Sequence, residues 1–483
     1  MNNIASSLYH AAHQSPNSIA LSCEGRSLRF AELETLVGQM RRFIERSSPV
    51  RKTPGDSGHG GVAAILACQG VESVAFAQAA LRCGLACTFI DPRFPAQRIA
   101  AILNDCQPCV LYTELARPRL QALLGAAALP PTLFADASAD AALALPTAPT
   151  ATPHSTLAEV QAWEPERQSP LPVAADAPAC LFYTSHASGK PVALRVSQRA
   201  LRASIDLAHA RFAFAAQDVF LTAAHSSCDF GGLCPFIAWE VGASVVLVPE
   251  TSAAFAVHLV DLVREQGVTT LWLTPFQLNA MVRQGGLLEG QAGCIRHIFC
   301  GGDAMALQTL RALHGWMAGR PLYALYGPAE APLRTVELVC AEELQALAAG
   351  GRSRASGPQG PDGPVAGQVW VRGVRVELDE VRHALTALPG VDQAALWLHA
   401  PDGGPHEIHA LCVARNTSER SIRWGLAQWL PSYMVPRRFH FVDALPEATQ
   451  TVMPGAAALP GASVSANANV STSATPALQG ALS

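Results

Sequence analysis

Residues 27–113 alternate between short apolar runs and amphipathic stretches. Residues 27–46 are predicted to form a short strand and then a helix, because apolar side chains recur there at intervals of three and four positions. The same pattern predicts strands over 61–68, 86–90 and 110–113 and helices over 74–82 and 99–103. Parallel strands joined through helices build layered sheets, so the chain is predicted to be an α/β protein.

The alternation continues in the middle of the chain after an interruption. Residues 124–178 are rich in Ala and Pro, and we expect a variable, mostly irregular segment there with one or two short elements. The pattern resumes at Cys180. It predicts strands over 219–223, 244–248, 269–273 and 297–300 and helices over 201–212, 254–266 and 307–317.

A change of composition divides the chain into a large and a small part. Residues 349–367 are rich in Gly and Pro and are predicted to be a short linker. We therefore expect a large domain over 1–348 and a small α/β domain over 368–447, with strands at 368–371, 393–398 and 408–414 and helices at 378–388 and 421–430. Residues 448–483 carry no charge and are rich in Ala and Ser, so we expect a disordered tail.

Composition excludes several classes of protein. The net charge is −4, only 15% of residues are charged and no Lys/Arg cluster is present, which argues against a nucleic-acid binder. No run of eighteen apolar residues and no secretory signal are visible, so we expect a cytoplasmic protein without a membrane contact. The 13 cysteines are an odd number scattered along the chain, as is typical of reduced thiols.

Two cysteine pairs leave a metal site as an alternative. Cys83 and Cys87, and likewise Cys106 and Cys109, have loosely zinc-like spacings. Both pairs fall inside the predicted strand–helix core, where a free cysteine packs as a small hydrophobic side chain. A hydrolase is disfavoured, because the sequence has no G-x-S-x-G motif.

A loop at residues 183–191 (YTSHASGKP) carries the first functional signal. A loop rich in hydroxyls and glycine that follows a strand can bind phosphates through backbone N–H groups and side-chain hydroxyls. It is not a Walker A loop, because Pro191 follows Gly189 and Lys190 where that motif has Ser or Thr. An ordinary surface loop remains the alternative on this segment alone.

A set of seven motifs follows in order along most of the chain. Their positions are Leu81–Asp91 with Pro92, Phe94, Pro95 and Arg98; Tyr183, Thr184, Ser185, Gly189, Lys190 and Pro191; Asp229, Gly242 and Ala243; Gly301, Gly302 and Asp303; Tyr326, Gly327, Pro328 and Glu330; Arg372, Gly373, Arg375, Glu377 and Glu380; and residues 430–436 (LPSYMVP). This ordered set resembles the adenylation domains of nonribosomal peptide synthetases, within the adenylate-forming superfamily. The resemblance implies a large layered α/β domain, with its β-barrel part shortened, and a small α/β C-terminal domain.

The resemblance implies a two-step reaction with ATP and Mg²⁺. A carboxylate attacks the α-phosphate to give an acyl-adenylate, and a carrier-protein thiol then takes the acyl group. Positioning and electrostatic stabilisation supply most of such catalysis. The implied roles are metal binding for Glu330, contact with the β- and γ-phosphates for Thr184 and Ser185, the nucleotide site for Gly189, Lys190, Gly302, Tyr326 and Gly327, and pairing with the substrate ammonium for Asp229.

Structural roles for the same residues stay open. Asp229 could cap a helix that begins near residue 231, Glu330 could be a solvated carboxylate at a helix start, and Tyr326 could simply pack in the core.

The resemblance also implies a substrate pocket with a mostly apolar wall. Its positions are Phe230, Leu233, Phe276, Phe299, Gly301, Leu325, Leu333 and Arg334. These bulky apolar side chains indicate a small hydrophobic or cyclic amino acid as the substrate. A carrier protein or a biosynthetic complex is the implied partner.

Several positions depart from the family pattern. His186 replaces a glycine of the loop, Val192 replaces its lysine, and Ala329 replaces a threonine. The segment 331–366 is short and lacks the ribose-binding TGD motif, and Val452 stands where the family has its catalytic lysine. Losing one transition-state contact commonly costs about 10²–10³ in rate. Two functions therefore remain: a stand-alone amino-acid-activating ligase with impaired catalysis, or an inactive relative that acts as a binding or scaffold subunit.

Overall fold

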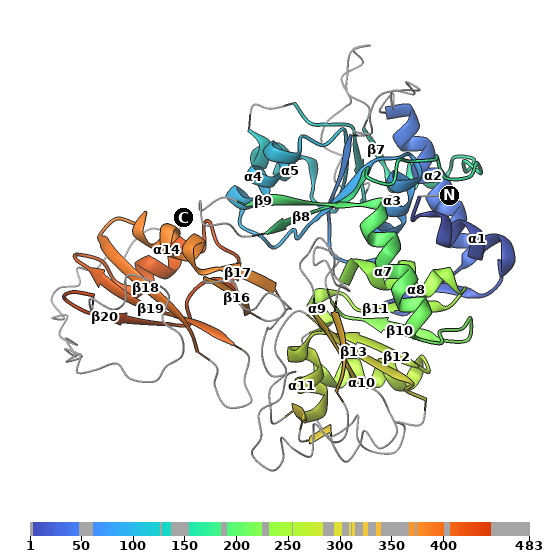
Figure 1. The fold of residues 1–483 in the computed structure, drawn as a ribbon. Helices are drawn as coiled ribbons and strands as arrows, with labels where there is room; N and C mark the ends of the chain where they lie inside the picture. The colour runs from blue at the N-terminus through green and yellow to red at the C-terminus, as the bar shows by residue number, and fades with distance from the viewer. Residues whose placement is uncertain are drawn as a thin grey trace, which may run out of the picture.

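A computed structural model describes most of the chain up to residue 445. The described residues are 3–47, 61–125, 128–136, 154–184, 191–224, 231–253, 255–283, 294–301, 309–310, 312–313, 322–326, 335–339, 367–371, 374–399 and 406–445. They form a large part built on two sheets and a smaller C-terminal part with its own sheets (Figure 1). The predicted α/β class is confirmed.

The first sheet of the large part has seven strands in the order β7-β6-β5-β3-β4-β8-β9. All neighbours pair in parallel except β8 and β9, which form an antiparallel hairpin. The strands are β3 (Val62–Leu66), β4 (Ala86–Ile90), β5 (Val110–Thr113), β6 (Thr132–Phe134), β7 (His154–Thr156), β8 (Pro178–Thr184) and β9 (Val192–Ser197), and the helices are α3 (Val71–Arg82), α4 (Ala96–Cys106), α5 (Arg117–Leu124) and α6 (Leu157–Gln161).

The second sheet of the large part has eight strands in the order β15-β14-β13-β12-β10-β11-β1-β2. The inner strands pair in parallel, and the edge strands β2 and β15 are antiparallel to their neighbours. The strands are β1 (Ile19–Cys23), β2 (Arg26–Arg29), β10 (Val219–Thr222), β11 (Ser244–Leu247), β12 (Thr270–Leu273), β13 (His297–Gly301), β14 (Leu322–Tyr326) and β15 (Thr335–Val339).

Helices cover both faces of this second sheet. Alternate strand residues point to opposite faces, so Trp272 and Phe299 join one buried cluster while Leu271 and Ile298 join another. The helices are α1 (Ser6–Gln14), α2 (Phe30–Ser47), α7 (Gln198–Arg211), α8 (Cys234–Glu240), α9 (Glu250–Ala253), α10 (Ala256–Glu265) and α11 (Pro275–Arg283), with a short 3₁₀ turn, η2 (Gly231–Leu233), leading into α8.

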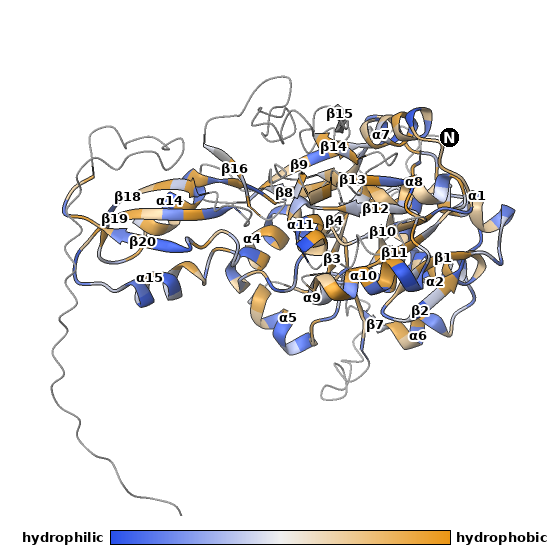
Figure 2. Cartoon of the chain, turned by 90° about the horizontal axis from the view of Figure 1, so that it is seen from below, coloured by the Kyte–Doolittle hydropathy of each residue, from blue (hydrophilic) through white to orange (hydrophobic). Residues whose placement is uncertain are grey.

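The small domain has a three-stranded sheet, β18-β19-β20, and a separate hairpin of β16 and β17. Its apolar core packs between the sheet and two helices, and the residues of α15 are largely hydrophilic (Figure 2). The elements are β16 (Gln368–Val371), β17 (Val374–Glu377), α14 (Leu378–Thr386), β18 (Val391–His399), β19 (Glu407–Ala414), α15 (Glu419–Leu426) and β20 (Arg438–Phe441).

The predicted elements mostly occur within one to three residues of their expected positions. Residues 124–178 differ, because they hold three short described elements, β6, β7 and α6, where one or two were expected. The expected helix at 254–266 is α9 followed by α10. Most of the expected helix at 307–317, the linker up to residue 366 and the tail from residue 446 lie outside the described residues.

Several elements were not predicted from the sequence. The pair Cys83 and Cys87 lies in the protein interior. The elements that sequence patterns missed include α1, β9, α11, β17 and β20. Cys83 and Cys87 are buried, and burial raises the pKa of the Cys83 thiol to about 12. The described residues contain no group of three or more potential metal ligands and no helix long and apolar enough to cross a membrane.

Candidate active site

The candidate site lies where four parallel strands of the eight-stranded sheet end. Strands β10, β12, β13 and β14 are neighbours and point the same way, so their carboxyl ends meet at one edge. Gly301 is the last residue of β13, and the backbone of Tyr326 ends β14. Ligands of open α/β sheets bind at such an edge. The fold thus brings two of the predicted site positions together there.

A hydrogen-bonded corner ties the ends of β10 and β12 to the start of α11. The Thr274 N–H donates to Gln277 Oε1 at 2.9 Å, and the Gln277 N–H donates to Thr274 Oγ1 at 3.4 Å. The Gln277 amide also donates to the Ala223 carbonyl at 2.7 Å, just beyond β10. This corner fixes the first turn of α11, which carries the half-buried Phe276 at the same edge. Sequence patterns missed Gln277, although Thr-x-x-Gln is a helix-capping signal.

Three of the predicted wall residues belong to one buried cluster. Leu233 comes from η2, Phe299 from β13 and Leu325 from β14, and each is almost fully buried. The Phe299 ring lies 4.8 Å from Phe212, 5.0 Å from Trp272 and 5.1 Å from Tyr323, measured between ring centroids. The surroundings of Phe299 are therefore apolar and aromatic, and the role of these residues as a substrate wall stays a prediction.

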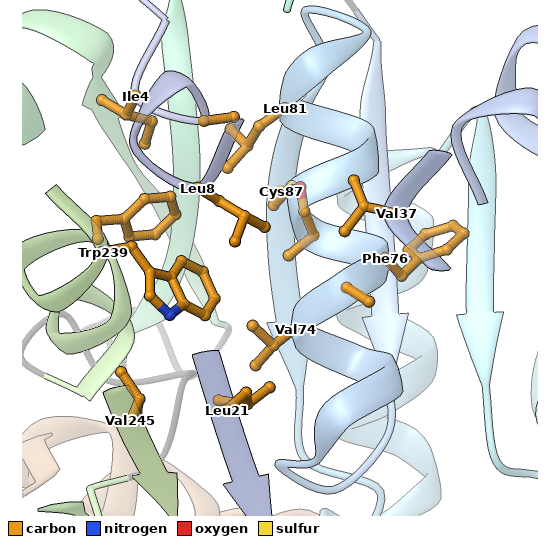
Figure 3. Close-up of a cluster of buried hydrophobic side chains, with 14 of the residues drawn as sticks. Ile4, Leu8, Leu21, Val37, Val74, Phe76, Leu81, Cys87, Trp239 and Val245 are labelled. Carbon is orange, nitrogen blue, oxygen red and sulfur yellow. Dashed lines mark hydrogen bonds between the residues drawn. The ribbon is translucent and has the colours of Figure 1, made fainter. Parts of the chain in front are cut away.

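Trp239 anchors the helix that follows Leu233. It points from α8 toward side chains of α1 and α3 (Figure 3), and its indole N–H donates to the Ala20 carbonyl of β1 at 2.9 Å. The ring is fully buried. This anchor fixes α8, and with it the position of Leu233 in the preceding turn.

A small cavity adjoins Leu233 on the side of the seven-stranded sheet. It offers about 30 Å³ to the centres of water-sized molecules, and its wall is almost entirely apolar. The buried Gln78 Oε1, which has no hydrogen-bond partner among the described residues, belongs to the lining. The lining residues are Val74, Ala77, Gln78, Leu81, Cys87, Phe89, Cys180, Phe182, Leu201, Gly232, Leu233, Pro235 and Phe236.

The loop rich in hydroxyls and glycine connects the two strands of the β8–β9 hairpin. Thr184 at the end of β8 is half-buried and lies opposite Val192 at the start of β9. The neighbouring Tyr183 hydroxyl donates to Asp105 Oδ2 of α4 at 2.6 Å. Burial, and then the Asp105 carboxylate, raise the pKa of Tyr183. The start of the loop is thus anchored to α4, and a strand rather than a helix follows the loop.

Many predicted site residues lie outside the described residues. They are Ser185, Gly189, Lys190, Asp229, Phe230, Gly302, Gly327, Glu330, Leu333 and Arg334, together with the side chain of Tyr326. Their proposed roles stay predictions.

A polar cluster that the sequence did not reveal lies at the opposite edge of the eight-stranded sheet. The buried Asp218 accepts hydrogen bonds from Arg296 Nη1 at 2.8 Å and from Thr269 Oγ1 at 2.8 Å. These residues precede β10, β13 and β12, so the cluster ties the amino ends of the strands together. No sequence signal marks it, because its three members are far apart in the chain.

Residues 8–374 match the family model described as AMP-binding enzyme. The chain belongs to this family. It is 26% identical over 500 residues to an L-proline–[L-prolyl-carrier protein] ligase of Pseudomonas fluorescens. This alignment covers 91% of this chain and 95% of that relative. It is 29% identical over 276 residues to the ligase of the same name from Streptomyces coelicolor, and 24% identical over 511 residues to surfactin synthase subunit 3 of Bacillus subtilis.

The extent of these matches differs between the relatives. The match covers 55% of this chain and 49% of the Streptomyces coelicolor ligase, and 91% of this chain and 37% of the surfactin synthase subunit. The chain thus spans half or less of the length of these two relatives.

Solved structures show the same fold at low sequence identity. Amide bond synthetase McbA from Marinactinospora thermotolerans superposes with a TM-score of 0.73 at 18% identity, over 93% of this chain and 98% of that chain. An artificially fused adenylation–PCP di-domain, NpsA-ThdA from Klebsiella oxytoca, gives a TM-score of 0.67 at 16% identity, over 90% and 93%. The predicted adenylate-forming architecture, with a large and a small domain, is confirmed.

Proposed function

We propose that the chain is a ligase that activates an amino acid as its adenylate and transfers it to a carrier-protein thiol. The observation that carries this proposal is the match of 91% of the chain to 95% of a relative named as an L-prolyl-carrier protein ligase. The candidate site at the carboxyl edge of β10, β12, β13 and β14 agrees with it, because that edge is where an α/β sheet binds its ligands.

The nucleotide would be held between the loop rich in hydroxyls and glycine and the strand edge. We assign the β- and γ-phosphates to Thr184 and Ser185, with Gly189 and Lys190 completing the loop. Gly302, Tyr326 and Gly327 would contact the adenine part. Glu330 would hold Mg²⁺, which supplies Lewis-acid stabilisation of phosphate charge when bound.

The loop fits ATP only in part. The hydroxyl of Thr184, at the end of β8, suits a phosphate oxygen. Opposite it stands Val192, a side chain 40% exposed and without charge, where the family has a cation. The loss of a positive charge at this place supports a slow first step.

The substrate would be a small hydrophobic or cyclic amino acid, and proline is the first candidate. Asp229 would pair with the substrate ammonium, and Phe230 would extend the wall formed by Leu233, Phe276, Phe299, Gly301 and Leu325. The buried, aromatic surroundings of Phe299 support an apolar substrate group, because a charged side chain would lose its hydration there without a partner.

ATP–pyrophosphate exchange with each common amino acid tests the proposal. We expect exchange with one apolar amino acid. Asp229→Ala should abolish it, whereas Asp261→Ala, on the exposed side of α10, should leave it unchanged. Val192→Lys should raise the exchange rate by about 10²-fold, because removing one transition-state contact commonly lowers the rate by about that factor. Val192→Leu should not raise the rate.

A non-catalytic binding subunit is the second candidate, and Val192 is the observation that favours it. It predicts a folded protein without exchange for any amino acid, in the wild type and in Val192→Lys alike. That result would overturn the ligase proposal. Exchange by the wild-type protein that Asp229→Ala abolishes would overturn the second candidate.

A further inference from the structure

The cavity beside Leu233 lies between helices that belong to different sheets of the large part. Its lining comes from α3, β4 and β8 of the first sheet and from α7, η2 and α8 of the second. Figure 3 shows Val74 and Leu81 of this lining on the side of α3 that faces α8. Small side chains leave the space open: Ala77 on α3, Cys87 and Cys180 on the paired strands β4 and β8, and Gly232 in η2. The cavity is therefore formed by elements that are already fixed by the fold.

One polar side chain belongs to this apolar wall. Gln78 is the only polar residue between Ser73 and Arg82 in the sequence, and it is 1% exposed. Its Oε1 atom is buried and accepts no hydrogen bond from any described residue. Such an acceptor is costly in the interior, because it loses its hydration and nothing replaces it. The described part of the wall thus offers one unused acceptor to an occupant.

Water is a poor occupant of this cavity. A buried water molecule typically makes about three hydrogen bonds to protein groups. Among the described lining residues, only Gln78 has a buried side-chain nitrogen or oxygen atom without a partner. The Cys87 thiol already donates to the Ala77 carbonyl at 3.4 Å. A better occupant has an apolar body and a single hydrogen-bond donor.

The wall also favours a neutral occupant. None of the described lining residues is acidic or basic. Burial raises the pKa of the Cys180 thiol to about 12 and the pKa of the Cys87 thiol well above its ordinary value, so both thiols stay uncharged near neutral pH. A charged molecule would lose its hydration here without finding a partner.

The volume of the cavity limits the size of the occupant. A buried water needs about 10–15 Å³ of the space that is open to its centre. The 30 Å³ of this cavity therefore corresponds to about two or three water positions. Bonded atoms lie closer together than neighbouring waters, so this space suits a molecule of about five non-hydrogen atoms.

We propose that this cavity binds a small neutral molecule with an apolar body and one hydroxyl group, such as a short-chain alcohol, and that the hydroxyl donates to Gln78 Oε1. The apolar body packs against the aliphatic and aromatic side chains of the wall. The occupant also contacts Leu233, so its binding stabilises the turn that leads into α8. The site does not depend on the proposed reaction, and its test needs no substrate.

Two isomers that differ in their hydrogen-bond donor test the proposal. 1-Butanol and 1-methoxypropane have the same atoms, but only the alcohol can donate. Saturation-transfer NMR titrations of the full chain measure the dissociation constant of each. Wild-type protein should bind 1-butanol about fivefold more tightly, which corresponds to one hydrogen bond of ordinary net strength. In Gln78→Leu the two isomers should bind within about twofold of each other, because the acceptor is gone.

Cys180→Leu tests the place of binding. The larger side chain fills part of the cavity and should weaken the binding of both isomers at least about tenfold. Cys106→Leu is the matched control, because it replaces another half-buried thiol, on α4 and outside the lining, and should change neither dissociation constant.

Far-UV circular dichroism identifies any variant that fails to fold, and the comparison of the isomers in the wild type needs no variant. The proposal is refuted if the wild-type protein binds neither isomer or binds both equally. It is also refuted if Gln78→Leu keeps the preference for the alcohol, or if Cys180→Leu binds 1-butanol as tightly as Cys106→Leu.

Discussion

Trp239 offers the sharpest test of how the structure holds the candidate site. The substitution Trp239→Phe removes the indole N–H that donates to the Ala20 carbonyl at 2.9 Å, in a fully buried place. An acceptor left without its partner costs about 1–3 kcal/mol. The smaller ring also lacks about three heavy atoms, which adds about 1–2 kcal/mol for lost burial. We expect a loss of about 3 kcal/mol in the free energy of unfolding.

Urea unfolding followed by far-UV circular dichroism measures this loss. Trp424→Phe is the matched control, because that indole is 70% exposed and its replacement should change the free energy of unfolding by about 0.5 kcal/mol or less. Under the proposed function, Trp239→Phe should also raise the KM for the amino acid. Helix α8 directly follows Leu233, so a shift of this helix would displace a residue of the proposed substrate wall. Equal, small shifts for the two variants would refute the packing described for α8.

Two further predictions concern the small domain. Burial and the neighbouring His399 lower the pKa of His409 from its ordinary 6.5. Below that pH the imidazole binds a proton more readily in the unfolded chain than in the folded chain. Stability that is present above pH 6.5 is therefore lost as the pH falls. The unfolding midpoint should change less between about pH 7.5 and about pH 5.5 in His409→Gln than in the wild type. An equal change of the midpoint in the two proteins would contradict this prediction. Gly390 has φ +83°, and a Cβ there would lie 2.5 Å from the Arg415 carbonyl oxygen. Gly367 has φ +87°, and no atom of the described residues lies within 4 Å of a Cβ built there. Gly390→Ala should therefore lower the thermal midpoint more than Gly367→Ala, and the reverse order would disprove the close contact.

The strands and helices of the large part were largely predictable, because periodicity is a property of one short segment. Strand β4 occurs at the predicted residues, and α3 begins three residues before its predicted start. The same local reasoning missed β9 and β20, which are short and partly polar. Their strand conformation comes from pairing with β8 and β19, and that pairing leaves no periodic signature in the segment itself.

The residue roles predicted for the candidate site stay predictions, because most of those residues lie outside the described part of the chain. Leu233, Phe299 and Leu325 are all members of one large buried cluster. The hairpin that sets Thr184 opposite Val192, and the Gln277 corner that fixes α11, were not foreseen. Both depend on backbone groups, whose partners are chosen by folding rather than by side-chain type.

By itself the sequence determined the α/β class, most element positions and the family resemblance, because these follow from local periodicity and from ordered motifs. The tertiary structure alone decided that Arg98 meets Glu380, that Trp239 reaches Ala20 and that Asp218 joins three strands. Each of these contacts links residues far apart in the chain. Their formation depends on the summed free energy of packing the whole molecule, and no single segment contains that information.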